Sequence, residues 1–366
     1  MGPFMGNDYS SRQIALPFFA LLVFVLCWGS THAEEGTNRG QPRVEWSIFD
    51  VRDDESNPVS LSNVYGIEVT EDAIFFSTVG DHSIWRSRLD GRGIKRYAGT
   101  GDPGFSGDGG PAIDAAFNAP HEIRSDSSGN LFIADTRNHC IRRIDSQTKH
   151  VETLAGDGVA GFQGDRGAAR FDQPHSLVLD GRGGILIADT KNHRLRRLEL
   201  ETNTIATIGG TGEKRLPEEG QNLTDAALFG PRSLAVHEDT TWLVLREGNS
   251  VWRLSGEERN WFRAAGTGRK GYSGDGEAAT LATFRGPKGI DLDAKSNIYI
   301  VDTENHAIRA IDSNTGKIWT LRCPFKLKRP HGVAVLREDQ DSGSTSILIS
   351  DSENDRVLSG RVWFDR

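Results

Sequence analysis

Cysteine and long apolar runs are scarce in this sequence. Three cysteines occur among 366 residues, and one of them, Cys27, lies in an N-terminal apolar segment. The other two, Cys140 and Cys323, are far apart, and two lone cysteines do not define a disulfide. After the N-terminal segment, no long stretch shows the 3.6-residue apolar period of a helix. The body of the chain is therefore expected to be neither helical nor membrane-spanning.

The signatures of common catalytic sites are missing as well. The sequence has no Gly-x-Ser-x-Gly elbow, no His-Glu-x-x-His pair and no P-loop. An excess of positive charge is also missing, because 43 Lys and Arg residues face 51 Asp and Glu residues and leave a net charge of -8. An acidic chain binds the phosphate backbone of nucleic acids poorly, so we expect no nucleic-acid partner.

The N-terminal segment has the order of a secretory signal. Arg12 precedes an apolar run from Ile14 to Trp28, and small residues lead to Ala33. This order predicts a cleaved signal peptide over residues 1–33, a linker over 34–43 and one domain over 44–366. An uncleaved anchor is the alternative. We expect a monomeric exported protein, whether periplasmic, extracellular or in the secretory pathway, with no membrane span once the signal is removed.

The body of the chain is a series of six related units. The phrase Asp-Thr-x-Asn-His places histidines at 139, 193 and 306, which lie 54 and then 113 residues apart. A second marker, a short segment usually centred on proline, recurs at intervals of 54, 57, 56 and 43 residues from Ala119 through Gln173, Gly230 and Gly286 to Arg329. The segment at Asn63 is the same marker without its proline, and it completes six units.

Each full unit carries four short runs with the alternation typical of β-strands. Four strands per unit, repeated six times, predict an all-β fold, a six-bladed β-propeller with four-stranded blades. A solenoid is the alternative. The last unit lacks a clear fourth strand, and the stretch from Val44 to Val51 resembles one. We therefore expect this N-terminal strand to close the ring and protect the blade edge, although Trp363 and Phe364 could complete the blade instead.

The sequence motifs of the units resemble those of a known family. The stretches "GDGGPA" from Gly107 and "GNLFIADTRNHCIRRID" from Gly129 are similar to those of NHL-repeat β-propellers, and the resemblance covers about residues 44–366. It implies the propeller fold. Units one, four and six depart from the pattern, which weakens the assignment of single residues there.

The repeated phrase is interpreted mainly as architecture. Asp, Thr and Asn commonly bind nearby backbone in turns, and a single ligand site does not need one copy per blade. The residues to which we give this structural role are Asp135, Asn138, His139, Asp189, Asn192, His193, Asp302, Asn305, His306, Asp351 and Asn354.

The alternative is a metal-dependent propeller enzyme. His139, His193 and His306 are of the type that zinc accepts, and the amidating lyases, which are related propellers, hold a metal with histidines. Glu68 lies where gluconolactonase-like propellers place a glutamate, but its neighbours do not match. Asp108, Asp165 and Asp275 recur in glycine-rich loops without the ladder of a calcium site. The sequence requires no cofactor, and zinc or calcium stays an alternative.

A second set of residues occupies the third position of each marker segment, where the inner strand of the unit is expected to enter the central channel. These six positions, one per unit, are Tyr65, His121, His175, Arg232, Lys288 and His331. Five of them can carry positive charge or donate hydrogen bonds, although the whole chain is acidic. We therefore predict a binding or scaffold module, rather than an enzyme, whose channel mouth contacts a protein, a peptide or a small anionic ligand.

Overall fold

The computed structural model describes residues 40–163, 169–255 and 259–364. The predicted signal peptide lies outside the described residues, as does most of the predicted linker. In the described part of the chain, no helix combines the length and apolar character that a membrane span requires.

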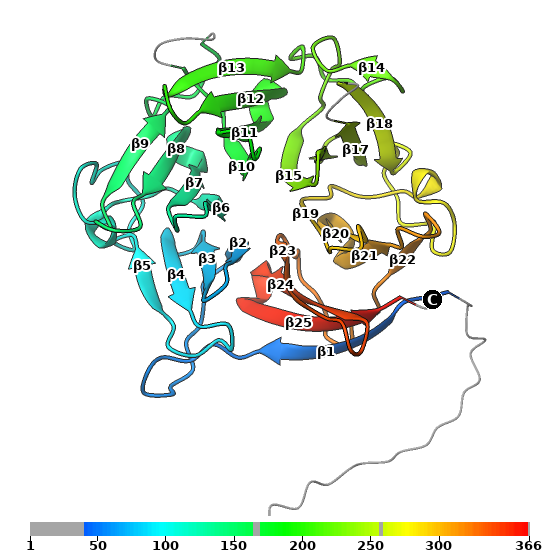
Figure 1. Cartoon of the computed structure of the whole chain (residues 1–366), viewed down its shortest axis with the longest axis horizontal. Coiled ribbons are helices and arrows are strands. Elements are labelled where there is room, and N and C mark those ends of the chain that lie inside the picture. Colours follow the sequence, from blue (N-terminus) through cyan, green and yellow to red (C-terminus); the bar gives the residue numbers. More distant parts are fainter. Residues whose placement is uncertain (1–39, 164–168, 256–258, 365–366) are drawn as a thin grey trace, which may run out of the picture. The chain divides into compact units, whose positions relative to one another are not determined.

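The described chain forms a ring of six β-sheets, the six-bladed propeller expected from the repeats (Figure 1). The first three blades are β2 (Val64–Val69), β3 (Ile74–Thr78), β4 (Ser83–Ser87) and β5 (Lys95–Ala98); β6 (Pro120–Ser125), β7 (Leu131–Asp135), β8 (Cys140–Ile144) and β9 (Val151–Ala155); and β10 (Pro174–Leu179), β11 (Gly184–Asp189), β12 (Arg194–Glu199) and β13 (Thr204–Gly209).

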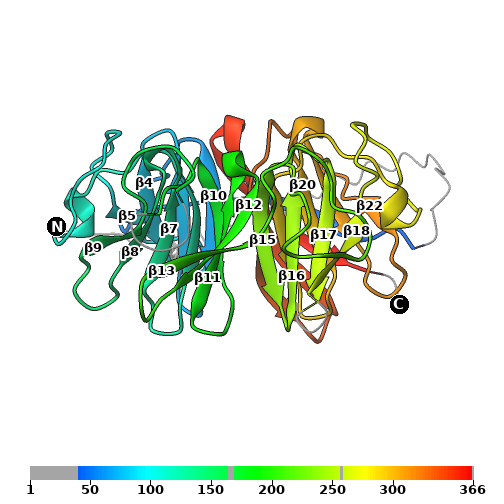
Figure 2. The same ribbon diagram turned by 90° about the horizontal axis from the view of Figure 1, so that it is seen from above.

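The other three blades follow in chain order. They are β15 (Pro231–His237), β16 (Thr240–Leu245), β17 (Ser250–Ser255) and β18 (Asn260–Ala265); β19 (Gly289–Leu292), β20 (Ile298–Asp302), β21 (Ala307–Ile311) and β22 (Ile318–Thr320); and β23 (Val333–Asp339), β24 (Ser344–Asp351), β25 (Arg356–Trp363) and β1 (Arg43–Phe49). Neighbouring strands within a blade are antiparallel, and the first strand of each blade lies nearest the axis (Figures 1 and 2). Blade 4 gains a short extra edge strand, β14 (Gln221–Asn222), that the four-strand pattern did not predict.

The ring is closed by the N-terminal strand, as the sequence predicted. In Figure 1, β1 lies along the outer side of β25. The two strands pair antiparallel from Arg43 opposite Trp363 to Phe49 opposite Val357. Because β1 completes the last blade, the first and last parts of the propeller are held in one sheet and no long edge of β25 is left unpaired.

The hydrophobic core lies between the blades. Each of the six core clusters found among the described residues joins side chains of two neighbouring blades. Blades 1 and 2, for example, meet through Ile84, Phe117 and Ile133, which are all fully buried. Burying such a side chain contributes about 1.5–3 kcal/mol. The short, apolar β7 and β20 are buried over their whole length because blades cover both of their faces.

The repeated phrase forms the turn between the second and third strands of a blade. Its middle residues form one-turn 3-10 helices, η2 (Thr136–Asn138), η3 (Thr190–Asn192), η5 (Thr303–Asn305) and η6 (Ser352–Asn354). The residue that ends each turn is left-handed, with φ between 50° and 54° at His139, His193, His306 and Asp355. Two further 3-10 helices, η1 (Ala112–Asp114) and η4 (Ala279–Leu281), lie in the loops that join blades.

The acidic and amide side chains of the phrase bind the loop that arrives from the previous blade. The Asp135 carboxylate does not cap η2; instead it accepts the Asn118 N–H at 2.8 Å. Asn138 donates to Asp135 at 2.7 Å and to the Gly104 carbonyl at 2.6 Å. Asp189 with Asn192, Asp302 with Asn305, and Asp351 with Asn354 repeat this arrangement in blades 3, 5 and 6. These bonds therefore fix the path of an inter-blade loop rather than a local cap.

The last residue of the phrase connects one blade to the next. His139 Nδ1 accepts the Gln173 N–H at 3.1 Å, and Gln173 directly precedes the first strand of the following blade. All six blades make this bond, which we call the blade latch; its acceptors are His82, His139, His193, Asn249, His306 and Asp355. A histidine that accepts through Nδ1 must be unprotonated there, and burial lowers the pKa of His82, His139 and His193 below the ordinary value.

Candidate functional site at the channel mouth

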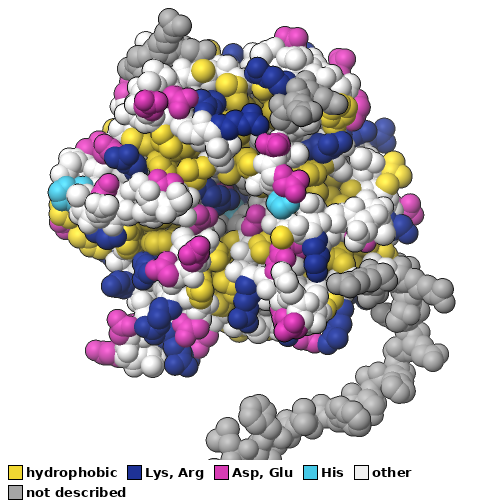
Figure 3. All heavy atoms as spheres, in the orientation of Figure 1, with side chains coloured by type: hydrophobic (Ala, Val, Ile, Leu, Met, Phe, Trp, Pro, Cys, Tyr) yellow, Lys and Arg dark blue, Asp and Glu magenta, His cyan; other side chains and the backbone are white. Residues whose placement is uncertain are grey.

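The six predicted channel residues come together in the structure. Tyr65, His121, His175, Arg232, Lys288 and His331 all line one narrow cavity on the axis, with a volume of about 30 Å³. A space of this size holds a water molecule or two, so a larger ligand could place only one small group in it. Figure 3 shows the hollow at the centre of the ring, with basic and acidic side chains around it.

The backbone explains why these residues point into the channel. In each blade the residue two positions before the channel residue takes a positive φ, as at Ala119, Gln173 and Gly230, where its N–H joins the blade latch. In blades 1 to 4 the strand pairing then shifts by a β-bulge at the channel residue, as between Pro174 and Ser176. A bulge re-aims a side chain, and here it aims one side chain per blade at the axis.

Glycine lets three of the inner strands approach one another closely. A Cβ atom at Gly66 would lie 2.3 Å from the His121 carbonyl oxygen, and one at Gly289 would lie 2.5 Å from that of His331. A Cβ atom at Gly332 would lie 2.2 Å from the carbonyl oxygen of Tyr65. The channel mouth is narrow because these positions carry no side chain.

Four aromatic rings form one side of the site. His331 stacks on Tyr65 with centroids 3.8 Å apart, and His121 meets Tyr65 edge-on at 4.6 Å. His175 in turn meets His121 edge-on at 4.7 Å. Aromatic pairs at these separations hold each other in place. This part of the site is therefore a packed cluster of four rings.

The hydrogen bonds of the three histidines fix where their protons lie. His121 Nδ1 is 2.7 Å from the Ala119 carbonyl oxygen and His331 Nδ1 is 2.8 Å from that of Arg329. His175 Nδ1 is 2.9 Å from the Thr190 hydroxyl oxygen, whose own hydrogen goes to the Pro231 carbonyl. Each Nδ1 therefore donates, and in a neutral ring each Nε2 is left as an acceptor.

Burial makes these histidines neutral, which differs from the cationic ring that the sequence suggested. Desolvation, helped by the positive charge of Arg232, sets the pKa of His121 and His175 well below the ordinary value. The pKa of His331 is lowered in the same direction by burial and by Lys288. Positive charge at the channel mouth therefore rests on Arg232 and Lys288 alone among the six.

Arg232 is a buried cation without a partner. It is 7% exposed, and among the described residues none forms an ion pair or hydrogen bond with its guanidinium group. Burial lowers its pKa to about 10, so the group stays charged at neutral pH. A buried charge is stable only when it is paired; Arg232 lines the cavity, and the carboxylates of Glu122 and Glu247 act on its charge without forming an ion pair with it.

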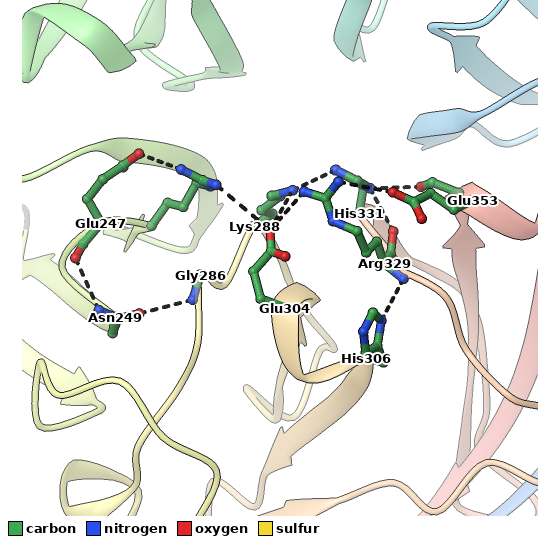
Figure 4. Close-up of polar contacts among 11 residues, drawn as sticks. Glu247, Asn249, Gly286, Lys288, Glu304, His306, Arg329, His331 and Glu353 are labelled. Carbon is green, nitrogen blue, oxygen red and sulfur yellow. Dashed lines mark hydrogen bonds and ion pairs between the residues drawn. The ribbon is translucent and has the colours of Figure 1, made fainter.

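Lys288 is also 7% exposed but has partners (Figure 4). Its Nζ lies 2.8 Å from His331 Nε2 and 3.4 Å from the Glu304 carboxylate. Burial and the nearby Arg232 and Arg329 lower its pKa to about 7. The lysine is therefore poised between its charged and its neutral form at neutral pH.

A second layer of charge lies along the inner strands. Arg124 reaches Glu122 at 2.5 Å and Glu68 at 3.6 Å, and Glu68 accepts the Ser125 N–H at 2.8 Å. Asp291 likewise accepts the Val335 N–H of the next blade at 2.7 Å. The sequence reasoning missed Glu122, Arg124 and Asp291, and the signal that could have found them is charge within an otherwise apolar inner strand. Two of the three, Glu122 and Arg124, also line the cavity.

The rim of the mouth is divided by charge. In blades 4 to 6, Glu247, Glu304 and Glu353 form ion pairs with arginines, including Glu304 with Arg329 at 2.8 Å and Glu353 with Arg329 at 3.0 Å (Figure 4). At the matching position of the phrase, blades 2 and 3 carry Arg137 and Lys191, which are exposed. Burial and Arg232 lower the pKa of His121, and the positive charge of Arg137 acts in the same direction; burial raises the pKa of Tyr65, and Arg137 offsets only part of that rise.

The histidines considered as zinc ligands do not converge. Each of His139, His193 and His306 is bonded to the backbone of its own neighbouring blade. Among the described residues, no three His, Cys, Asp or Glu side chains are grouped closely enough to hold a metal ion. Asp108 and Asp275, considered as calcium ligands, pair instead with Arg142 at 2.7 Å and Arg309 at 2.9 Å, and Asp165 lies outside the described residues.

Comparison with known proteins agrees with the repeat. The NHL repeat model matches residues 117–144 and 171–198, which contain the first two full copies of the phrase. Human NHL repeat-containing protein 2 is 26% identical over 300 residues, which cover 72% of this chain and 40% of the relative. The chain is an NHL-repeat β-propeller.

Two further likenesses place this NHL-repeat propeller among others of its fold. A probable peptidyl-alpha-hydroxyglycine alpha-amidating lyase of Caenorhabditis elegans is 25% identical over 124 residues, 34% of this chain and 32% of the relative. The structure of an auxiliary nutrient binding protein from Bacteroides thetaiotaomicron matches with a TM-score of 0.62 and 10% identity, over 89% of this chain and 78% of that one. The propeller spans less than half the length of the NHL repeat-containing protein 2 relatives that it matches.

Proposed function

We propose that this propeller is a binding module that captures a small anionic ligand, or the carboxylate of a peptide, at the mouth of its axial channel. The proposal rests on Arg232. This residue is 7% exposed and lines the cavity, and its guanidinium group has no hydrogen-bond or ion-pair partner among the described residues. An anion there would supply the missing charge-assisted hydrogen bonds.

The neighbours of Arg232 support an anion rather than a cation. Lys288 adds a second buried amine, and Tyr65 adds a hydroxyl group to the same cavity. The exposed Arg137 and Lys191 lie on the rim of blades 2 and 3 and would attract an anion toward the mouth. The narrowness of the cavity limits the occupant to a small ion or to one terminal carboxylate of a larger ligand.

Calorimetric titration tests this proposal. Acetate, propanoate, succinate and phosphate would be titrated at low salt into the wild type and into Arg232→Met, which keeps the side-chain length and removes the charge. Arg253→Met, on β17 of the same blade and exposed, is the matched control. Loss of one charge-assisted contact, about 1.5–3 kcal/mol, should weaken binding at least about tenfold in Arg232→Met alone. Equal affinity in all three proteins would overturn the proposal.

The rival function is a metal-dependent propeller enzyme. The likeness to the C. elegans lyase favours it. Against it, the buried cations Arg232 and Lys288 line the same cavity and would repel a metal ion. Elemental analysis after dialysis against a weak chelator separates the two, because about one zinc or calcium ion per chain would favour the enzyme.

We also propose that the protein works outside the cytoplasm, on the strength of the secretory signal predicted over residues 1–33. N-terminal sequencing of the exported protein should find Glu34 as the first residue. A mature chain that begins at Met1 or Met5 and stays in the cytoplasm would contradict this part of the proposal.

A further inference from the structure

Lys288 has the surroundings of a reactive amine rather than of a structural cation. It is the lysine in the lining of the channel cavity, in the position that blades 2, 3 and 6 fill with histidine. A lysine held in a pocket beside another cation becomes a nucleophile because its neutral form is favoured. Arg232 is that cation, and its field acts on Lys288.

The Nε2 atom of His331 is placed to act as a base toward the Lys288 amine. Its Nδ1 hydrogen is committed to the Arg329 carbonyl oxygen at 2.8 Å and lies 3.0 Å from the Ser352 hydroxyl oxygen, which itself donates to the Val64 carbonyl. The Nε2 lone pair therefore faces Lys288 Nζ at 2.8 Å and can take a proton from it. Figure 4 shows Lys288 between His331 and Glu304, which holds the other side of the amine.

We infer that Lys288 forms a reversible imine with a small 2-oxo carboxylate whose carboxylate is bound by Arg232. This inference rests on the proposed function, since the same anion site docks the ligand, and it adds the ligand's second group, a carbonyl next to the carboxylate. Tyr65, which is stacked on His331, lines the same cavity and would donate a hydrogen bond to the carbonyl oxygen.

The step balances without any further reagent. The Nζ lone pair attacks the carbonyl carbon, and His331 Nε2 takes one of the two Nζ protons and passes it to the new alkoxide oxygen, which gives the neutral carbinolamine. The second Nζ proton follows the same route to the hydroxyl group, which leaves as water while the C=N bond forms. The reverse reaction with water releases the oxo acid unchanged.

Trapping by reduction tests the imine on the full chain. The protein would be incubated at pH 7 with pyruvate and cyanoborohydride, which reduces an imine to a stable amine, and then mapped by peptide mass. We expect a carboxyethyl group on Lys288, saturating with pyruvate, while the exposed Lys95 and Lys149 stay largely unmodified. Ordinary lysines are almost fully protonated at pH 7, since their pKa is about 10.4. Uniform labelling of the three lysines would overturn the inference.

Variants and related probes separate the imine from anion binding. Lys288→Arg keeps the positive charge, so it should bind pyruvate by calorimetry and show no trapping at residue 288. Propanoate, which has no carbonyl, should compete with trapping, whereas acetone, which has no carboxylate, should be trapped at least about tenfold less. Saturable pyruvate binding without trapping in the wild type would overturn the imine and leave the proposed function intact. Absence of any carboxylate binding would overturn both.

The pH profile distinguishes a base at His331 from a structural role. The groups that face the Lys288 amine are Arg232, Arg246, Arg329, Glu304 and His331, and together with burial they place its pKa at about 7. The trapping rate should therefore fall as pH drops below about 7. His331→Gln, which keeps a polar contact but removes the base, should slow trapping by a larger factor than it weakens propanoate binding. An unchanged trapping rate in this variant would exclude the base.

Discussion

Arg232 is the residue on which the account of the site depends. It sits in a position that three other blades fill with neutral histidine, and its charge is neither exposed nor paired within the described structure. A buried polar group without a partner costs about 1–3 kcal/mol of folding free energy, and a charged one costs more. A cost of this kind, which no partner residue relieves, is typical of a position that serves a ligand rather than the fold.

This cost gives a prediction for the ligand-free protein. Arg232→Met should raise the melting temperature in the absence of small anions, because an unpaired buried charge is replaced by an apolar side chain of similar length. Thermal denaturation by circular dichroism in a non-coordinating buffer measures the effect. A variant that melts below the wild type would show that Arg232 has a stabilising role that the account does not include.

At the scale of the element, the blade latch is the hydrogen bond that joins each blade to the next. Three residue types fill the same left-handed position and accept the same N–H from the next blade: His in four units, Asn249 in one and Asp355 in one. The chain itself thus shows that His, Asn and Asp side chains can each accept the latch hydrogen bond. The common requirement is an acceptor at the right reach on a residue that tolerates a positive φ.

A pair of variants in blade 3 tests the latch. His193→Ala leaves the Gly230 N–H without its acceptor at 3.1 Å and should destabilise the propeller by about 1–3 kcal/mol. His193→Asn should recover most of this loss, because Asn249 already serves in blade 4. Chemical denaturation of both variants supplies the comparison, and neither should alter carboxylate affinity. Equal stability of the alanine and asparagine variants would rule out the latch.

Ring closure by β1 is the second element on which the fold depends. Deleting Arg43–Phe49 removes the partner of β25 over its whole paired length and exposes the side of the last core cluster, where Val44 and Trp46 pack. We expect the deletion variant to melt far below the wild type and to aggregate through its open edge. Ile48→Ser, a change at an exposed position of the same strand, should melt normally. Native melting of the deletion variant would exclude β1 as a closing strand.

The propeller and its channel residues could be predicted because they repeat. The spacing of the marker segments predicted six inner strands. The third residue of each marker was expected to line the channel, which identified Tyr65, His121 and the other four residues of the mouth. Burial could not be predicted in this way. The histidines lost their expected charge, and Lys288 acquired its contact with His331, through packing between blades that are distant in sequence. Arg124 and Glu122 were missed because the repeat pattern drew attention to one position per inner strand, although a charge pair within an apolar strand was visible in the sequence.

At the scale of the whole molecule, stability should depend on pH through the latches. The native pKa of His82, His139 and His193 is below the unfolded value of about 6.5, so the unfolded chain binds more protons than the native one just below that pH. Their contribution to stability is complete above about pH 6.5 and is lost as pH falls. The carboxyls of Asp135, Asp189 and Asp302, whose pKa burial raises to about 6, act in the opposite direction.

A combined variant isolates the histidine contribution. Replacing His82, His139 and His193 with asparagine keeps the acceptors and removes the titrating groups, while the buried carboxyls stay the same in both proteins. When the pH is lowered from 7 to 5, the urea midpoint should change less favourably in the wild type than in this triple variant, because only the wild type protonates latch histidines. An identical pH dependence in the two proteins would contradict protonation of the latches.

The central claim is that the Arg232 guanidinium holds an anion at the channel mouth. The most direct measurement is the Nε–H resonance of Arg232 in arginine-labelled protein, assigned by its disappearance in Arg232→Met and followed through a titration with propanoate. The account predicts a saturable shift of this resonance, with the same midpoint as the calorimetric titration. A resonance that stays in place while the protein binds propanoate would show that the anion binds elsewhere.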